Sequence, residues 1–288
     1  MITVVLGFAT SLVYGFADFF GALSSRKMKP IIVTFFSGLT GLAFLFAMSP
    51  VFGIPADSNA IFWGTMAGLA SAVAMTALYA SLAIGPISIL SPLGAVMSAL
   101  VPMAFGVIFR GESFSPVGWL ALLGILIAVV LVGFIPGADV RKPSAKGLLF
   151  GLLAGSFIGI VLICINQAPT NSGLTSVVLL RGVSAATIGL LILGAVLAKR
   201  SFSVNDFKVS AKTWTTVGLT GILDSSANVF FLFAMRYGSL TVVSVLTALY
   251  PLGTLILARV FLKEKIAKVQ LAGVLLALSC SALLASGI

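Results

Sequence analysis

Asp224 and Asn228 lie four residues apart inside the largely apolar stretch Thr213–Arg236. This spacing places both side chains on one face of a helix. The stretch is long enough to cross a bilayer, and Asp224 would lie near the midpoint of that crossing. A carboxylate at this depth costs about 2.5–3.5 kcal/mol unless it faces water or a partner. We therefore expect this face either to line a central polar cavity or to bury a structural acid between helices.

A second polar face is predicted in the first apolar run of the chain. Ser11, Tyr14 and Asp18 follow one another at spacings of three and four residues, and Gly21 comes three residues later. These spacings place all four positions on one side of a helix that is otherwise apolar. Asp18 is therefore a second candidate carboxylate for the cavity, with Ser11 and Tyr14 as neutral hydrogen-bonding groups.

Arg181 is the candidate base, about two turns inside the apolar run 174–197. One interpretation is that its long side chain reaches the nearer membrane interface and has no further role. The other is that it pairs inside the membrane, either with Asp224 or with an acidic group of a ligand. The sequence leaves both open.

The three ionisable candidates define the ligand that such a cavity would accept. If Asp18, Arg181 and Asp224 are ionised and share one cavity, their charges sum to −1, which suits a zwitterion or an organic cation better than a dianion. Arg181 would bind a carboxylate as a planar fork and Asp224 an ammonium, with Asn228 and Tyr14 as neutral partners. Since burial disfavours an ionised carboxyl, either aspartate is also a candidate for proton coupling, whereas facilitated diffusion needs no such residue.

The composition excludes a water-soluble chain. Of the 288 residues, 60% are hydrophobic and only 8% are charged, against about 25% charged in soluble domains. The net charge of +10 comes almost entirely from short loops, where it reports membrane orientation rather than nucleic-acid binding. With two cysteines in apolar runs, no histidine and no phosphate-binding GxxxxGK[ST] motif, we expect no metal site and no cofactor.

The chain contains ten apolar runs, each a candidate transmembrane helix. Their approximate bounds are 2–23, 31–49, 60–83, 87–109, 116–135, 147–166, 174–197, 213–235, 239–262 and 267–287. The loops between them are short, so no separate soluble domain is expected. The fold class predicted is an all-α integral membrane protein with ten transmembrane helices.

Ordered matches between the two halves of the chain indicate an internal duplication. A shift of 144 residues places Gly7, Gly15 and Gly38 on later glycines, and a shift of 153 places Ser71 on Asp224 and Met75 on Asn228. We expect two five-helix repeats, residues 1–140 and 141–288. Because five is odd, the second repeat must insert upside down, which gives inverted repeats with a site near the midplane.

The basic residues predict the orientation in the membrane. Loops after the odd-numbered runs hold thirteen Lys and Arg, and loops after the even-numbered runs hold only Arg110 and Arg236. By the positive-inside rule the odd loops face the cytoplasm and both termini lie outside, in a multi-pass protein of the cell membrane.

Two further segments carry a family resemblance. Arg110–Gly124 and Lys263–Leu278 each place a glutamate, Glu112 or Glu264, just before the last run of its half. With ten runs in two halves, the chain resembles the drug/metabolite transporter superfamily of the EamA type. The resemblance implies a transporter of small metabolites with a cavity lined by spans 1–4 and 6–9, with spans 5 and 10 peripheral. It also implies cytoplasmic termini, against the charge count.

The function expected is secondary transport of a small organic solute, such as an amino acid, an organic cation or a drug-like molecule, across the plasma membrane by alternating access. A proton-coupled exporter is one candidate form of it. A membrane-embedded enzyme is disfavoured, because the sequence has no histidine and no catalytic pair at membrane depth. An uncoupled facilitator or exchanger, or a signalling or structural membrane protein, remains open as an alternative. We expect the lipid bilayer and a small organic solute as partners and no nucleic acid; the sequence leaves substrate, direction and oligomeric state undetermined.

The two glutamates receive a structural interpretation from physical chemistry alone. Each precedes a helix N-terminus, where a carboxylate is stabilised by the helix dipole, and each has Lys or Arg neighbours with which to pair, Arg110 for Glu112 and Lys263 or Lys265 for Glu264. We expect neither to belong to the site.

Overall fold

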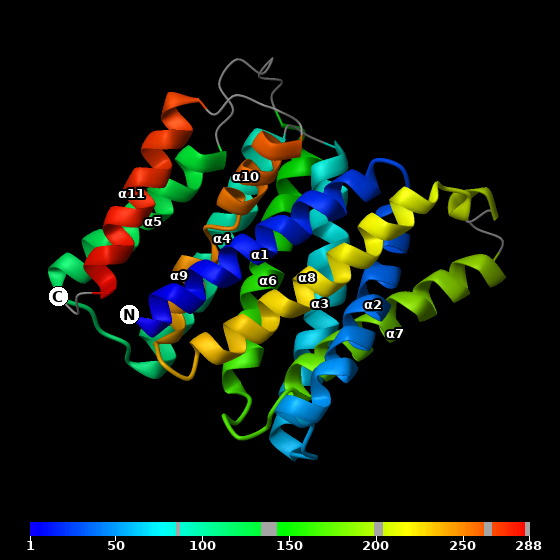
Figure 1. The fold of residues 1–288 in the computed structure, drawn as a ribbon, viewed down its shortest axis with the longest axis horizontal. Coiled ribbons are helices and arrows are strands. Elements are labelled where there is room, and N and C mark those ends of the chain that lie inside the picture. The colour runs from blue at the N-terminus through cyan, green and yellow to red at the C-terminus, as the bar shows by residue number, and fades with distance from the viewer. Residues whose placement is uncertain (85–86, 134–142, 199–203, 262–266, 286–288) are drawn as a thin grey trace.

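The computed structural model describes every residue except 85–86, 134–142, 199–203, 262–266 and 286–288. The regular structure of the described residues is entirely helical (Figure 1). The helices are α1 (Ile2–Ser25), α2 (Pro30–Phe52), α3 (Ser58–Ile84), α4 (Ile87–Arg110), α5 (Pro116–Gly133), α6 (Ala145–Gln167), α7 (Thr175–Leu197), a 3-10 turn (Val204–Phe207), α8 (Ala211–Ala234), α9 (Leu240–Thr247), α10 (Pro251–Phe261) and α11 (Lys268–Ala285).

Seven of the described helices are long and apolar enough to cross a membrane: α1, α2, α3, α4, α6, α7 and α8. The remaining apolar helices are shorter, and they include α5, α11 and the α9–α10 segment. Each of the ten apolar runs expected from the sequence therefore contains helix. The expected division between the halves near residue 140 lies outside the described residues.

The ninth apolar run was expected to form one helix and instead forms two. The residues between α9 and α10 adopt tighter turns, in which Leu249 N–H donates to Leu246 O at 3.1 Å and Tyr250 N–H to Thr247 O at 3.1 Å. The cause is Pro251, which has no N–H to donate to the carbonyl four residues earlier. Periodicity alone could not show this break, since leucines and valines continue through it.

Polar caps fix where several helices begin. At each of these N-termini a side-chain oxygen accepts a hydrogen bond from a backbone N–H of the first turn, which otherwise has no partner. The capping residues are Asp57 for α3, Ser115 for α5, Ser144 for α6, Ser210 for α8 and Ser239 for α9.

The helices of the two chain halves interleave rather than forming separate bundles. α1 packs along α8 and against α9 and α10, while α6 packs along α3 and α4. α2 packs on α7 and α8, and α3 packs on α7. α5 and α11 lie side by side at one edge of the molecule, away from α2 and α7 (Figure 1). The centre is thus enclosed by helices from both halves.

Glycines allow the closest helix crossings. A Cβ on Gly15 of α1 would lie 2.1 Å from Tyr250 O and 2.6 Å from Gly253 Cα, and a Cβ on Gly253 would lie 2.4 Å from Leu12 O. The backbones of α1 and α10 therefore touch at this crossing. α6 and α4 also approach closely, because a Cβ on Gly155 of α6 would lie 2.4 Å from Gly94 O of α4.

Loop contacts show which connections share an end of the bundle. Lys29, between α1 and α2, pairs with Asp206, between α7 and α8, at 2.7 Å. At the other end of α2, Leu174 N–H donates to Gly53 O at 2.9 Å and Thr175 Oγ1 to Pro55 O at 2.7 Å. The loops between α2 and α3 and between α6 and α7 therefore lie together, opposite the loop that holds Lys29.

Glu112 has a structural role, as expected, but not with the expected partners. Its two carboxylate oxygens accept the backbone N–H groups of Leu240 and Thr241, each at 3.0 Å, and so cap the N-terminus of α9. Arg110 hydrogen-bonds Gln167 instead. The carboxylate thus stabilises a helix of the other half rather than the helix that follows it, which sequence proximity could not indicate. Glu264, Lys263 and Lys265 lie outside the described residues.

Candidate functional site

A cavity lies at the centre of the bundle between helices of both halves. The space between its lining residues amounts to about 560 Å³, a volume that includes space open to solvent. Its lining comes from α1, α3, α4, α6, α7, α8, α9 and the α9–α10 break, and consists of Tyr14, Asp18, Ser71, Ala74, Met75, Leu78, Ser98, Ile158, Val161, Leu162, Leu180, Arg181, Asp224, Asn228, Thr247 and Tyr250. α2, α5 and α11 contribute no residue to this lining. The resemblance implied that spans 5 and 10 would be peripheral, and it also implied a contribution from span 2, which this lining lacks.

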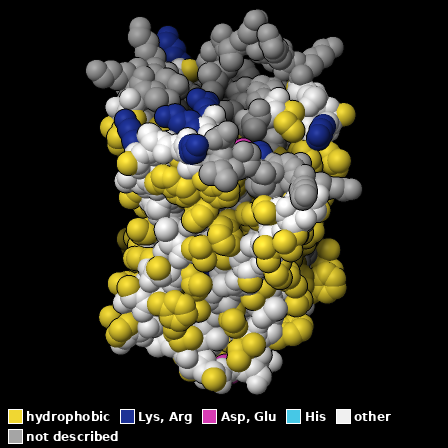
Figure 2. Space-filling view, turned by 90° about the vertical axis from the view of Figure 1, so that its right-hand side faces the viewer, with side chains coloured by type: hydrophobic (Ala, Val, Ile, Leu, Met, Phe, Trp, Pro, Cys, Tyr) yellow, Lys and Arg dark blue, Asp and Glu magenta, His cyan; other side chains and the backbone are white. Residues whose placement is uncertain are grey.

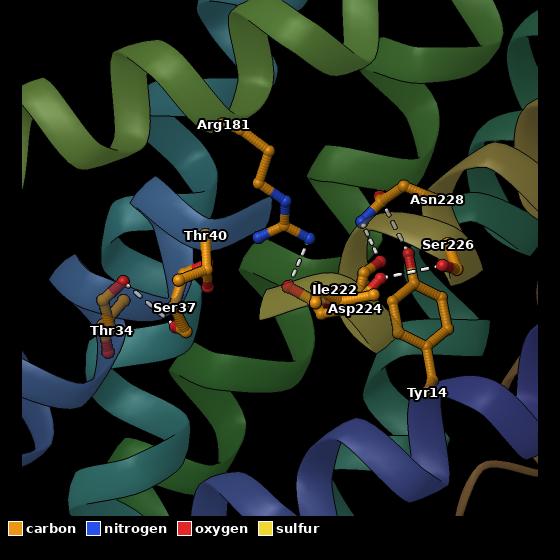
Figure 3. A network of polar contacts seen from close by, with 9 residues as sticks. All are labelled: Tyr14, Thr34, Ser37, Thr40, Arg181, Ile222, Asp224, Ser226 and Asn228. Atoms are coloured by element: carbon orange, nitrogen blue, oxygen red, sulfur yellow. Dashed lines mark hydrogen bonds and ion pairs between the residues drawn. The ribbon is translucent and has the colours of Figure 1, made fainter. Parts of the chain in front are cut away.

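The polar face of α8 is held by a chain of hydrogen bonds. Tyr14 of α1 donates its hydroxyl to Asn228 Oδ1 at 2.8 Å, and Asn228 Nδ2 donates to the carbonyl of Asp224 at 2.8 Å (Figure 3). Asn228 is 2% exposed, so both ends of its amide are fixed in a largely dry setting. The sequence spacing of four residues thus produces one polar face, as predicted, and α1 lies against it.

Arg181 reaches from α7 to the carboxylate of Asp224 and forms an ion pair with Oδ2 (Figure 3). The arginine is 5% exposed and the aspartate 7%. Of the two interpretations of Arg181, the structure therefore favours pairing with Asp224 over a side chain that extends to the membrane interface, because a buried charge needs a counter-charge. The pair is electrically neutral, and Arg181 Nε has no hydrogen-bond partner among the described residues.

Asp18 shares the cavity but not the network. It lies one turn beyond Gly15 on α1 and lines the same space as Asp224. Within the described part of the chain, its carboxylate makes no hydrogen bond and no ion pair. The two aspartates were both predicted to be cavity carboxylates. They differ in that Asp224 has Arg181 as a counter-charge, whereas Asp18 has none among the described residues.

Ser11 is the one sequence candidate that lies away from the cavity lining. It is fully buried, and its hydroxyl donates to the carbonyl of Phe8 in its own helix at 2.9 Å. Three other hydroxyls near the network are satisfied in the same way, those of Ser37, Thr40 and Ser226 (Figure 3). These groups are poor candidates for binding a ligand, since they already have a partner.

Sequence reasoning missed four polar residues of the lining as site candidates, and two of them lie at the helix break. Thr247 and Tyr250 flank the break between α9 and α10 and are 3% and 4% exposed. Neither hydroxyl has a hydrogen-bond partner among the described residues. The available signal was Pro251, since a proline inside an apolar run marks a place where the helix can open and present polar groups. Ser71 and Ser98 complete the polar positions missed.

Metal ligation is not supported by the described residues. No cluster of three or more Cys, Asp or Glu side chains occurs among them, and Cys164 and Cys280 are separate buried thiols on α6 and α11. The chemistry available to the cavity is ion pairing and hydrogen bonding.

The sequence matches the EamA-like transporter family over residues 1–134 and again over 145–286. The chain belongs to this family. This match is consistent with the drug/metabolite transporter superfamily, which the segments that carry Glu112 and Glu264 resemble. As an EamA family member with several long apolar helices, it is a multi-pass membrane protein.

Structural comparison supports the same fold. A solved structure titled only "Crystal structure of protein" superposes with a TM-score of 0.75 at 17% sequence identity, and covers 98% of this chain and 96% of the other. At this identity the likeness extends to the fold alone. No curated protein sequence matches significantly.

Proposed function

We propose that this EamA family protein is a secondary transporter that moves a small organic solute through the central cavity by alternating access. The observation that carries the proposal is the cavity itself: charged and polar side chains inside a bundle of long apolar helices that come from both halves of the chain. Buried ionisable residues in a membrane are costly and usually mark a solute or proton pathway. The solutes that its charges suit are amino acids, organic cations and drug-like molecules.

The packing of the helices supports two inverted five-helix repeats, residues 1–140 and 141–288, with α9 and α10 together forming one span of ten. If the repeats match α1 with α6, α2 with α7, α3 with α8 and α5 with α11, contacts in one half should have counterparts in the other. The contact α1–α8 then corresponds to α6–α3, and α2–α8 corresponds to α7–α3. The pairs α2–α7 and α5–α11 map onto themselves. A pseudo-twofold axis in the membrane plane would produce this pattern, and it passes through the site in transporters built this way.

Residues aligned by the repeat also meet in the cavity. Ser71 and Met75 of α3 line it together with Asp224 and Asn228 of α8, the positions to which a shift of 153 residues carries them. Rocking of one half against the other would then open this shared lining to either side. Glycine crossings such as Gly15–Gly253 suit such movement, because small residues let helix backbones slide closely.

For orientation, we propose that the loops after α1, α3, α5, α7 and α10 face the cytoplasm and both termini face outside. On the face seen in Figure 2, Lys and Arg side chains gather toward one end, above a surface that is mainly hydrophobic. Single cysteines in place of the exposed Lys208, Ser58 and Thr170 test this, in a background without Cys164 and Cys280. An impermeant thiol reagent should label positions 58 and 170 in intact cells and spare 208; the reverse pattern overturns the orientation.

Flux into proteoliposomes tests the transport function. We expect saturable, protein-dependent uptake of at least one member of a panel of amino acids, polyamines, quaternary amines and nucleosides. An imposed pH gradient, applied to the parent and to Asp18→Asn and Asp224→Asn, tests coupling, since an amide cannot carry a proton. Unchanged rates and pH dependence in both variants would favour an uncoupled facilitator or exchanger. Absence of any protein-dependent flux would favour a signalling or structural role.

A further inference from the structure

Apart from Ser71 and Ser98, the polar groups of the cavity fall into two sets that differ in how fully they are satisfied. The first set is Arg181, Asp224, Asn228 and Tyr14, which are joined by an ion pair and two hydrogen bonds. Its formal charges cancel. A ligand that used Arg181 to bind a carboxylate, as the sequence suggested, would first have to separate Arg181 from Asp224, which costs a buried ion pair.

The second set is Asp18, Thr247 and Tyr250, and none of its side chains has a partner among the described residues. The hydroxyls of Thr247 and Tyr250 are more than nine-tenths buried and line the cavity. Buried polar groups are almost always hydrogen-bonded in proteins, so two unpartnered hydroxyls and an unpartnered carboxylate in the lining of one cavity indicate a place that a ligand completes.

The helix crossing explains why these three groups come together. The backbones of α1 and α10 touch at Gly15 and Gly253, and the carbonyl of Tyr250 lies against Gly15. Asp18 follows Gly15 by one turn of the same helix, and Thr247 precedes Tyr250 by one turn at the break before Pro251. The crossing and the break thus fix both sides of the set through backbone contacts rather than through flexible side chains.

The rest of the wall is mainly apolar, so the body of the ligand should be apolar as well. Its apolar residues are Ala74, Met75, Leu78, Ile158, Val161, Leu162 and Leu180. An apolar lining with a few convergent polar groups is typical of small-molecule sites. One carboxylate without a counter-charge, two hydroxyls that can accept hydrogen bonds, and an apolar wall match an ammonium group on an apolar body.

We propose that the cavity binds an organic monocation, a primary or secondary ammonium on an apolar body, with Asp18 as its counter-ion and the Thr247 and Tyr250 hydroxyls as hydrogen-bond acceptors. The Arg181–Asp224 pair stays closed and forms part of the wall. This inference deepens the proposed transport function and rests on the same cavity, but it concerns binding and can be measured without transport.

Four probes with the same phenyl body separate the charge types: 2-phenylethylammonium, the neutral 2-phenylethanol, zwitterionic phenylalanine and anionic 3-phenylpropanoate. Binding to the purified full chain in detergent is measured by calorimetry, at a pH where the amine is protonated. We expect the ammonium probe to bind at least about tenfold more tightly than each of the others. Equal or tighter binding of phenylalanine or 3-phenylpropanoate, or binding of none of the four probes, overturns the proposal.

Variants then locate the counter-ion. Asp18→Asn should weaken binding of 2-phenylethylammonium by about tenfold or more, Asp18→Glu should restore part of it, and Thr247→Val and Tyr250→Phe should each weaken it about threefold. Ser226→Ala, which removes a hydroxyl of α8 outside the cavity lining, should leave it unchanged. An unchanged affinity in Asp18→Asn, with a gel-filtration profile like the parent's, overturns the assignment.

The two proposals fail in different ways. Ammonium binding that depends on Asp18, without flux in proteoliposomes, would refute transport and leave the binding site standing. Flux of anionic or zwitterionic solutes, with no binding of 2-phenylethylammonium, would refute the monocation site and leave transport standing.

Discussion

Two carboxylates line one cavity, and within the described part of the chain only Asp224 has a partner. Asp224 on α8 pairs with Arg181 of α7, and the amide of Asn228 anchors the same turn. Asp18 on α1 has no such partner among the described residues, and the hydroxyls of Thr247 and Tyr250 are likewise unsatisfied. The difference lies in the neighbouring helix: α7 supplies a counter-charge to Asp224, and no described residue supplies one to Asp18. On the proposal above, Asp18 is therefore the acid that a ligand would neutralise.

The largest expected effect comes from removing the counter-charge of Asp224. Arg181→Met should destabilise the fold by about 3–5 kcal/mol, because it leaves a buried carboxylate unpaired. Thermal unfolding of the purified variants in detergent measures this as a lower midpoint. The double variant Arg181→Met with Asp224→Leu should recover most of the loss, since an apolar pair needs no counter-charge. A single variant as stable as the parent would mean that the pair is not structural.

A smaller effect should follow from separating α1 and α10. Gly15→Ala places a Cβ 2.1 Å from Tyr250 O, and neither backbone can yield without moving its helix. We expect a loss of about 1–3 kcal/mol in unfolding free energy. Binding of 2-phenylethylammonium should also weaken, because moving α1 away from α10 changes the separation of Asp18 and Tyr250, which line the same cavity.

The matched control for that crossing is Gly38→Ala on α2. There the new Cβ would meet Ala185 Cβ at 3.4 Å, an ordinary contact, so stability and binding should stay close to those of the parent. Equal losses in Gly15→Ala and Gly38→Ala would show that the α1–α10 crossing has no special role.

Tyr14→Phe should lower the stability of the protein only slightly. It removes the hydrogen bond to Asn228 Oδ1 and leaves the ring in place. Hydrogen bonds between membrane helices contribute about 0.6 kcal/mol on average, so the unfolding midpoint should drop by a small and measurable amount. Binding of the ammonium probe should be much less affected than in Tyr250→Phe. The opposite ranking would place the ligand on the Asp224 side.

Asp18→Asn should also have a small effect on stability. No ion pair or hydrogen bond to a described residue is lost, and the amide is less costly to bury than an ionised carboxylate, so unfolding free energy should change by less than about 1 kcal/mol. The informative comparison is Asp224→Asn, which leaves Arg181 without its counter-charge and should destabilise more. If Asp18→Asn proved the more destabilising of the two, Asp18 would have a structural partner.

The sequence predicted the elements of this fold and much of its site, because both depend on local patterns. Apolar runs predict spans, and spacings of three and four residues place Tyr14, Asp18, Asp224 and Asn228 on inward faces. The choice of partner for Arg181 depends on how α7 and α8 pack, which no local pattern records. The cap that Glu112 forms on α9 likewise joins residues that are 128 and 129 positions apart in the chain.

Two features of the candidate site could not be predicted from the spacing of apolar and polar residues alone. Thr247 and Tyr250 lie in an apolar run and look like ordinary core positions until Pro251 is seen to break the helix there. Ser11 shares the helix face of Tyr14 and Asp18, yet its hydroxyl bonds its own backbone and lies outside the cavity lining. A helical face spans more than the width of a small cavity, so residues on one face need not share one site.

Access to the cavity from both sides of the membrane tests the central claim most directly. Ser71→Cys places one thiol in the lining, in a background without Cys164 and Cys280, and Ser11→Cys provides a buried thiol outside it. A small, charged, impermeant thiol reagent is applied separately to right-side-out and inside-out vesicles. Alternating access predicts that position 71 is modified from either side, that a transported solute slows both reactions, and that position 11 does not react. Modification of position 71 from one side only, with or without solute, would contradict the account.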